Sequence, residues 1–393
     1  ITTGFKHRDN KILKTVTNPI NTNTLTINLS FLPGAGAPSY VFNLQSIGKN
    51  NEKEELDKVG ESDVDNRQDT RTTNMLLSIN YPLTYRSIKH NFVLNYNNMK
   101  NTDKTAFIEI QNVILKHDYR EMSLLSKIMN NVYIKESAEM ILENINKGKI
   151  IISTGFFEII PKTIETDGPP GAFSIGNAIT ELGGDVIYLI ESHTKNFISK
   201  DQKTIIFPNT TKEESIKFAK NIIEDYKPSA LISIERCGIT ENDRYLNISR
   251  QDISNYNAYI DVLFDLHKNT IGIGDGGNEI GTGNLYEYIS SSDKYINEPT
   301  ISKTKHLIVT TVSNWGGWGL ASALSLLSNK NLLETVKEAT DIMQNQLDLG
   351  AVDGANFKSE LSVDGFDWEI NKNILLKLHK IINKYLNLHN KRI

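Results

Sequence analysis

Acidic and glycine-rich segments follow four short apolar runs of this sequence, and these segments hold the residues best suited to chemistry. The apolar runs cover residues 149–154, 230–234, 270–273 and 307–312. The polar and glycine residues that follow them are, in chain order, Glu165, Asp167 and Gly171; Glu235 and Arg236; Asp275, Asn278 and Glu279; and Asn314 and Gly316. Carboxylates that are brought together repel one another unless a cation, a proton or a cationic substrate lies among them. Their clustering therefore predicts a functional site.

The loop after residues 270–273 has the residue types of a divalent-metal site. Asp275, Asn278 and Glu279 offer oxygen atoms, which are ligands for Mg²⁺ or Mn²⁺. The glycines between them allow a small ligand or a hydrated ion to approach the backbone closely. In any single loop, Asp and Asn more commonly cap helices, and glycines more commonly permit tight turns. Four such loops at consecutive strand ends favour a site over four separate turns.

The string Gly272-Ile-Gly-Asp-Gly-Gly277 formally matches the dinucleotide-binding pattern GxGxxG. The match lies at the end of its strand, and Asp275 and Glu279 would face a pyrophosphate with charges of the same sign. We therefore expect no nucleotide cofactor.

The string Gly274-Asp-Gly-Gly-Asn278 also resembles the metal-binding stretch of haloacid dehalogenase-type phosphatases. Such enzymes need an aspartate nucleophile in a DxDx[TV] loop after an early strand. The nearest strings are Asp63-Val-Asp65, which lies in a highly charged segment, and Glu165-Thr-Asp167, which begins with the wrong acid. A metal-dependent, phosphatase-like hydrolase therefore remains an alternative hypothesis.

Residues from about 105 onward alternate between helical and strand-like patterns. The expected strands are 149–154, 186–190, 204–207, 230–234, 270–273 and 307–312. The expected helices lie near 105–129, 132–147, 172–182, 212–226, 254–267, 318–328, 331–347 and 369–388. This alternation predicts an α/β fold of Rossmann-like, three-layer type, with a mainly parallel sheet and helices on both faces. Because ligands of such sheets bind beyond the carboxyl ends of the strands, the acidic segments should share one rim.

The first 100 residues have a different character. Residues 24–32 and 75–96 look strand-like, whereas residues 51–71 are about half charged and predict a solvated linker or loop. We therefore divide the chain into an N-terminal segment of unknown role, 1–100, and a catalytic domain, 101–393. The N-terminal segment has few apolar residues for a core of its own, which suggests packing on the main domain, on a second copy or within a larger assembly.

Composition and charge limit the partners, covalent links and targeting signals that this sequence can have. The formal charge of −4 gives no reason to expect nucleic-acid binding, and no apolar run is long enough to span a membrane. Cys237 is alone, so internal disulfides are excluded. Residues 1–14 contain Lys6, Arg8, Lys11 and Lys14 against Asp9, a basic bias slightly like the edge of an organelle-targeting segment.

Four motifs, taken in order and with their spacing, resemble the C-terminal domain of the D-glutamate cyclase family. They are Glu165-Thr-Asp-Gly-Pro-Pro-Gly-Ala172, Ile234-Glu-Arg-Cys-Gly238, Ile273-Gly-Asp-Gly-Gly-Asn-Glu-Ile-Gly281 and Val312-Ser-Asn-Trp-Gly-Gly317. A further match is Val352-Asp-Gly354. The similarity extends from about residue 105 to the C-terminus. Animal members have a larger hydratase-like domain upstream, for which residues 1–100 are too short.

The resemblance implies a lyase that converts D-glutamate, a small acidic amino acid, into 5-oxo-D-proline and water. On this hypothesis Asp275 and Glu279 hold a divalent metal with Asn278 alongside, and Arg236 binds a substrate carboxylate. Glu165, Asp167 or Glu235 would bind the ammonium group and act as base or acid, and Asp275 is also expected to be catalytic. The residues expected to bind substrate are, besides Arg236, Gly171, Asn278, Asn314 and Gly316.

A non-enzymatic alternative is a catalytically silent subunit that keeps the cyclase fold, with residues 1–100 as its docking segment. The resemblance also bears on the compartment. Animal members are mitochondrial, so we expect the mitochondrial matrix, whereas a microbial member should be cytoplasmic.

Overall fold

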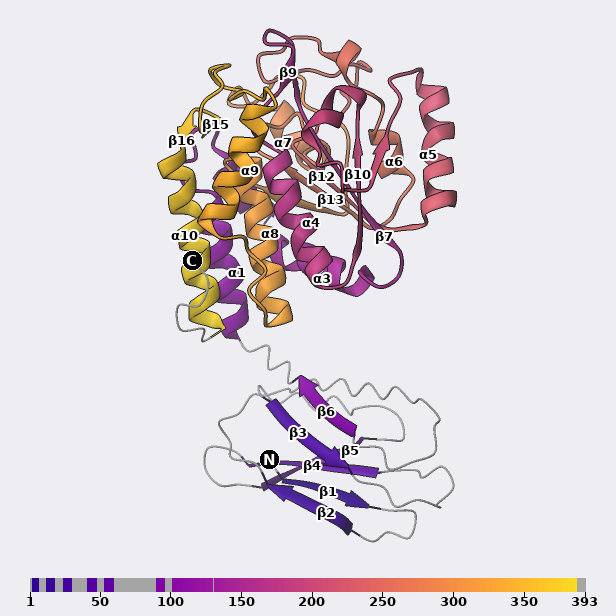
Figure 1. Cartoon of the computed structure of the whole chain (residues 1–393), viewed down its shortest axis with the longest axis vertical. Helices are drawn as coiled ribbons and strands as arrows, with labels where there is room; N and C mark the ends of the chain where they lie inside the picture. The colour runs from indigo at the N-terminus through magenta and orange to yellow at the C-terminus, as the bar shows by residue number, and fades with distance from the viewer. Residues whose placement is uncertain are drawn as a thin grey trace. The chain divides into compact units, whose positions relative to one another are not determined.

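The computed structural model describes residues 101–129 and 131–386 and, within residues 1–100, the backbone of six strands (Figure 1). The chain divides into two compact units, Ile1–Asp103 and Lys104–Ile393.

Antiparallel strands make up the described part of the first unit. One sheet has the order β2-β1-β4-β5, and a second pairs β3 with β6. The strands are β1 (Thr2–Lys6), β2 (Ile12–Thr17), β3 (Thr24–Leu29), β4 (Val41–Ile47), β5 (Lys53–Val59) and β6 (His90–Asn95). Part of the charged segment expected to be a linker is therefore strand β5. The rest of that segment, and most of 75–96, lies outside the described residues.

A six-stranded parallel sheet organises the second unit, which confirms the predicted α/β fold. Its order is β11-β10-β7-β12-β13-β14. The strands are β7 (Lys149–Thr154), β10 (Asp185–Ile190), β11 (Thr204–Ile206), β12 (Pro228–Ile234), β13 (Thr270–Gly274) and β14 (His306–Val309). Two short hairpins are added, β8 (Phe157–Glu158) with β9 (Thr163–Ile164) and β15 (Ser362–Val363) with β16 (Phe366–Asp367).

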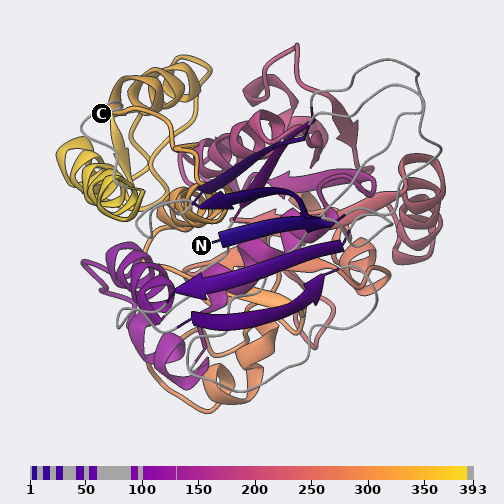
Figure 2. The same ribbon diagram turned by 90° about the horizontal axis from the view of Figure 1, so that it is seen from below.

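Helices cover both faces of this sheet (Figures 1 and 2). The α-helices are α1 (Asn101–Ile114), α2 (Met122–Met129), α3 (Tyr133–Asn144), α4 (Pro169–Glu181), α5 (Lys212–Tyr226), α6 (Asp261–Asp265), α7 (Tyr286–Ser290), α8 (Ser313–Ser328), α9 (Val336–Asp348) and α10 (Trp368–Tyr385). Short 3₁₀ turns are η1 (Ser192–Phe197), η2 (Ser254–Tyr256) and η3 (Gly283–Leu285). None of the helices in the described part is long and apolar enough to cross a membrane.

Alternation along the buried strands separates two apolar cores. Ile150 and Ile152 of β7 pack into the core that contains α3, α4, α8 and α10, whereas Ile151 points to the other face, beneath α5 and α6. Such strands are buried on both sides, which explains why they read as continuous apolar runs in the sequence.

The chain order of the strands reverses beside β7. From β7 the chain moves outward to β10 and β11, returns to β12 on the other side of β7, and continues to β13 and β14. The crevice at such a reversal is the usual ligand site of an open parallel sheet. The acidic segments follow the four adjacent strands β7, β12, β13 and β14.

Four predicted helices differ from the observed ones, and the one expected over 331–347 begins only at Val336. The helix expected over 105–129 is broken between α1 and α2, and most of the helix expected over 254–267 is loop, with only α6 regular. The helix expected from 318 begins at Ser313, so Asn314 and Gly316 lie in its first turn and not in a loop. This first turn packs closely against α4, since a Cβ at Gly171 would lie 2.9 Å from the Cα atom of Asn314.

Helices α4 and α8 approach so closely that glycine is required at their contact. A Cβ atom at Gly317 would lie 2.7 Å from both the Cα and the carbonyl oxygen of Gly171. These are backbone atoms, which cannot move aside cheaply.

We expect Gly317→Ala to lower the free energy of unfolding by roughly 1–2 kcal/mol, because overpacking outweighs the gain of about 1 kcal/mol in helix propensity. Chemical denaturation of the variant and wild type measures this difference. Ser328→Ala, in the last turn of the same helix, is the matched control and should change stability by less than about 0.5 kcal/mol. A Gly317→Ala protein more stable than wild type would contradict the packing argument.

Candidate active site

Seven buried carboxyl groups gather beyond the carboxyl ends of β7, β12 and β13, and we call them the acidic cluster. Each is less than one-tenth exposed; they are Glu158, Glu165, Asp167, Glu235, Asp275, Glu279 and Asp364. Five of them were candidate site residues on sequence grounds, and Glu158 and Asp364 are additional. Burying so many like charges is unfavourable unless protons, cations or hydrogen bonds compensate.

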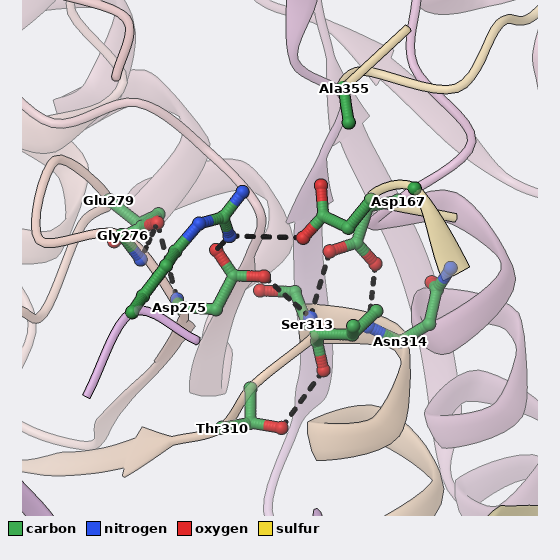
Figure 3. Close-up of polar contacts among 12 residues, drawn as sticks. Asp167, Asp275, Gly276, Glu279, Thr310, Ser313, Asn314 and Ala355 are labelled. Atoms are coloured by element: carbon green, nitrogen blue, oxygen red, sulfur yellow. Dashed lines mark hydrogen bonds and ion pairs between the residues drawn. The ribbon is translucent and has the colours of Figure 1, made fainter. Parts of the chain in front are cut away.

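Asp167 lies at the amino end of α8 (Figure 3). Its Oδ2 accepts the backbone N–H of Ser313 at 2.8 Å, and its Oδ1 accepts that of Asn314 at 2.7 Å. Asp275 also accepts the Ser313 N–H, at 3.2 Å. The unpaired N–H groups and the dipole of a helix amino end favour negative charge, so α8 stabilises both carboxylates.

Asn314 holds the loop that leads into α4. Its Oδ1 accepts the N–H groups of Gly168 (3.0 Å) and Gly171 (2.8 Å), and its Nδ2 donates to the carbonyl of Thr166 (2.9 Å). The side chain expected to orient a substrate is therefore used to fix the backbone around Asp167.

The two glycines expected to bind substrate, Gly171 and Gly316, have packing roles in the structure. A Cβ at Gly171 would lie 2.7 Å from the Cδ1 atom of Ile234, and one at Gly316 would lie 2.6 Å from the Cγ2 atom of Ile273. Both positions bring a helix close to the end of a strand.

Glu279 organises the loop after β13. Its carboxylate accepts the backbone N–H groups of Asp275 (3.2 Å), Gly276 (2.6 Å) and Gly277 (2.9 Å). The side-chain Nδ2 of Asn278 donates to the carbonyl of Leu246 at 3.1 Å, while a Cβ at Gly276 would lie 2.8 Å from Asn278 Oδ1 and 2.9 Å from Glu279 Oε1. Three backbone donors fix the Glu279 carboxylate. It lies beside Asp275 (Figure 3).

Arg120, which the sequence analysis did not single out, provides positive charge to the cluster. Its Nη1 atom donates to Asp275 Oδ1 at 2.5 Å and to Asp364 Oδ2 at 3.0 Å. The ring of Tyr119 lies beside the guanidinium, 4.8 Å from its Cζ atom. Arg120 lies within the region expected to be one continuous helix, and no motif surrounds it, so no local signal marks it.

Asp364 occupies the two-residue turn between β15 and β16. Asp364 and Gly365 both have positive φ, 52° and 77°, as a type I′ hairpin requires. The Asp353 carboxylate accepts the Gly365 N–H at 2.9 Å and so fixes this turn. The Asp-Gly dipeptide is a hairpin signal that could have located the turn from the sequence, but not its contact with Arg120.

Arg236 does not take the position expected of a substrate ligand. Its side chain is buried, and its guanidinium donates to Glu191, Asn257 and the carbonyl of Ala258. Burial and the charge of Arg236 lower the pKa of nearby His193 to about 4. Arg236 therefore anchors the loop after β12, next to Glu235, whose φ of 43° is in the left-handed region.

Burial raises the pKa of several cluster carboxyls. It raises the pKa of Asp167 to about 7, with the charge of Asp364 adding to the effect. Burial and the surrounding carboxylates hold the pKa values of Glu165, Glu235 and Asp275 well above their usual range. The carboxyl groups of Asp167 and Asp275 lie side by side, because both accept the backbone N–H of Ser313. At neutral pH the metal-free cluster therefore retains protons.

Two groups of carboxylates could hold a metal ion, and Asp275 belongs to both. They are Asp167, Asp275 and Asp364, and Glu235, Asp275 and Glu279; within each, the ligand atoms lie within 4.8 Å of one another. The first group already has the Arg120 guanidinium as its cation. In the second, the buried Oε2 atom of Glu235 has no hydrogen-bond partner. The second group therefore fits a divalent ion better.

The string Glu165-Thr-Asp167, considered above for a phosphatase nucleophile, lies at this cluster, whereas Asp63-Val-Asp65 lies outside the described residues. A bridge pairs Glu165 with Val352, and a Cβ at Gly354 would lie 2.0 Å from Glu165 Oε2. The glycine of Val352-Asp-Gly354 thus leaves room for the Glu165 carboxylate.

The raised pKa values predict a stability that falls as pH rises. Burial raises the pKa of Glu158 from 4.5 to about 7, so the folded protein binds more protons than the unfolded chain across that interval. Stability should fall by about 1.4 kcal/mol per pH unit for each such proton. We expect the free energy of unfolding of Glu158→Gln, measured by denaturant titration in EDTA, to fall less steeply between pH 4.5 and 7 than that of wild type.

The exposed carboxyl Asp341 on α9 offers the control, because Asp341→Asn should leave the slope unchanged. Identical slopes for Glu158→Gln and wild type would contradict the raised pKa of Glu158.

Comparison with solved structures finds distant similarity. An exopolyphosphatase-related protein from Bacteroides fragilis aligns with a TM-score of 0.33 and 10% identity, covering 65% of this chain and 62% of that one. RecJ from Thermus thermophilus, solved in complex with Mn²⁺, aligns with a TM-score of 0.29 and 11% identity, covering 64% and 38%.

Sequence comparison is more specific. The human protein named D-glutamate cyclase, mitochondrial, is 28% identical over 202 residues, which is 45% of this chain and 33% of the human protein. The match thus spans a third of that relative's length. The model of the family described as D-glutamate cyclase-like, C-terminal, matches residues 110–379, most of the chain and all six strands of the parallel sheet. The chain belongs to the D-glutamate cyclase-like family.

Proposed function

We propose that the protein is a lyase that cyclises D-glutamate to 5-oxo-D-proline with release of water. Family membership supports this class of reaction, and the named human relative is a D-glutamate cyclase. The single observation that most favours it in this chain is the buried pairing of Asp167 and Asp275 at the amino end of α8.

The reaction sets clear requirements. The α-amine of the substrate attacks its own γ-carboxyl carbon, so ring closure itself supplies proximity. The γ-carboxylate is a poor electrophile because it is anionic and its leaving group is oxide or hydroxide. Its charge must be neutralised and the departing oxygen protonated, while a base removes a proton from the ammonium group.

The Asp167–Asp275 pair provides the acid in this proposal. The two carboxyl groups lie side by side, since both accept the Ser313 N–H. Burial raises the pKa of Asp167 to about 7, so Asp167 would carry the proton while Asp275 stays ionised as a metal ligand. Donation of that proton to the leaving oxygen leaves a carboxylate, which the backbone N–H groups of Ser313 and Asn314 stabilise. The attacking nitrogen loses a second proton after ring closure, and transfer of this proton to the same oxygen releases water.

Glu165 is the proposed base. Burial and neighbouring carboxylates hold its pKa well above the usual range. A carboxylate of raised pKa is a stronger base toward ammonium. Glu165 must first be ionised, which the positive charge of the substrate's ammonium group would favour. The Glu165 carboxylate would then accept a proton from that ammonium group before ring closure.

Glu235, Asp275 and Glu279 are the residues proposed to hold Mn²⁺ or Mg²⁺, as their mutual distances allow. A bound divalent ion would supply positive charge that neutralises the γ-carboxylate. The Nδ2 atom of Asn278 donates to the carbonyl of Leu246, which leaves its Oδ1 atom as the possible neutral ligand alongside this group.

The function is tested by incubating the full chain with D- or L-glutamate, with Mn²⁺, Mg²⁺ or EDTA, and separating the products by chiral chromatography. We expect 5-oxo-D-proline from D-glutamate. Asp275→Asn and Asp167→Asn should each lower the rate by roughly 10²–10⁴-fold, the usual contribution of a positioned acid. Asp341→Asn is the control. Wild-type activity in the Asp275→Asn variant would overturn the assignment, and release of phosphate from simple esters would favour the hydrolase hypothesis.

Metal binding is tested independently of activity. Calorimetric titration with Mn²⁺ should show a site in wild type that Glu235→Gln weakens at least about tenfold, because one charged oxygen ligand is lost. Glu369→Gln, an exposed carboxyl on α10, should bind like wild type. Equal affinity in all three proteins would remove Glu235 from the metal site.

We also propose a compartment for this protein and a role for residues 1–100. The human relative is mitochondrial by name, and we propose the mitochondrial matrix for this protein, to be tested by localising a tagged chain.

For residues 1–100 we propose a docking role toward a second copy or a larger assembly. Light scattering of the full chain and of residues 101–393 would compare their oligomeric states.

A further inference from the structure

We propose that Arg120 binds the α-carboxylate of the substrate and so makes the site selective for α-amino acids over amines that lack this group. The inference rests on the proposed cyclisation and adds a specificity residue to it. With Arg236 used internally, Arg120 is the cation in contact with the acidic cluster among the described residues.

One edge of the Arg120 guanidinium remains available. Both of its ion pairs, to Asp275 and Asp364, use the Nη1 atom. No hydrogen bond joins Nε or Nη2 to another residue in the described part of the chain. These two N–H groups form the fork that matches a carboxylate with two parallel hydrogen bonds.

Arg120 also lies at the outer boundary of the cluster. Its side chain is 19% exposed, whereas those of its partners Asp275 and Asp364 are 3% and 5% exposed. A substrate whose γ-carboxyl group contacts the deeper Asp167–Asp275 pair would direct its other end outward. The Nε–Nη2 edge, which takes no part in the two ion pairs, is therefore suited to the α-carboxylate.

The loop that holds Arg120 is fixed before any substrate arrives. Asp118 accepts the N–H groups of Met122 and Ser123 and so caps α2. On the other side of Arg120, the hydroxyl of Tyr295 donates to the carbonyl of Glu121 at 3.0 Å. A guanidinium held in this way loses little freedom on binding, which favours affinity and selectivity.

Charge balance supports the same role. Glutamate has two carboxylates, and the cluster is itself acidic, so an α-carboxylate without a cationic partner would be repelled. Asp275 and Asp364 fix Arg120 through its Nη1 atom and leave its Nε and Nη2 atoms for the α-carboxylate of the substrate. An analogue with a neutral α-carboxamide would gain nothing from that edge.

The test compares D-glutamate with D-isoglutamine, which has the same chain and stereocentre but an α-carboxamide. Cyclisation of each releases water, so one assay serves both. We expect the full-length wild type to prefer D-glutamate by roughly 100-fold in kcat/KM, as two charge-assisted hydrogen bonds imply. In Arg120→Ala this preference should fall to near unity, mainly through loss of activity on D-glutamate. Arg120→Lys should retain part of the preference, because it keeps the charge but loses the fork.

Arg244→Ala is the matched control, since Arg244 is exposed and pairs only with Glu298 among the described residues; its substrate preference should equal that of wild type. Circular dichroism and melting temperature establish that each variant folds. An unchanged preference in Arg120→Ala, with both substrates slowed equally, would overturn the inference and leave Arg120 only the task of neutralising Asp275 and Asp364.

The proposed function can fail separately. If wild type cyclises neither compound, calorimetric binding of D-glutamate and D-isoglutamine to wild type and Arg120→Ala decides the inference alone. A preference for D-glutamate that disappears in the variant supports it, and equal preference in both proteins refutes it.

Discussion

The accumulation of carboxyl groups away from water is the constraint on which the rest of this structure depends. An isolated buried carboxylate is so costly that it usually takes up a proton or finds a partner. Here protons, the Arg120 guanidinium and backbone N–H groups compensate the buried negative charge. Arg120 and the N–H donors come from different elements of the fold. The Glu279 loop and the first turn of α8 place N–H donors toward the cluster, so helix and loop geometry compensates part of the charge.

Close packing of α4 against α8 is what places those donors. Glycines at 171 and 317 allow the two helices to meet at backbone distance, and the Asn314 amide ties the loop before α4 to the start of α8. Asp167 lies between them and accepts N–H groups from α8. A change of a single methyl group at this contact would therefore move the acid as well as loosen the core.

Strained backbone accompanies the chemistry. Glu235 and Asp364 both have positive φ, which costs free energy for residues with a Cβ atom. Each is fixed by a buried polar group elsewhere: Arg236 and its partner Glu191 anchor the loop after β12, and Asp353 holds the hairpin turn. Proteins commonly give up stability at functional sites in this way. The expected fall in stability as the cluster loses its protons agrees with this pattern.

Local patterns in the sequence determined the six-stranded sheet, its two covered faces and the acidic loops at its rim, because short apolar runs and glycine-rich turns are encoded by neighbouring residues. Tertiary structure alone decided which polar groups meet. Arg120 contacts Asp275 and Asp364 across 155 and 244 residues, and no periodicity specifies such a pairing. The same holds for Arg236, which turned to Glu191, and for Asn314, which fixes backbone. Residue type predicted that charge would gather at the rim; the partner of each charge depended on packing between distant elements.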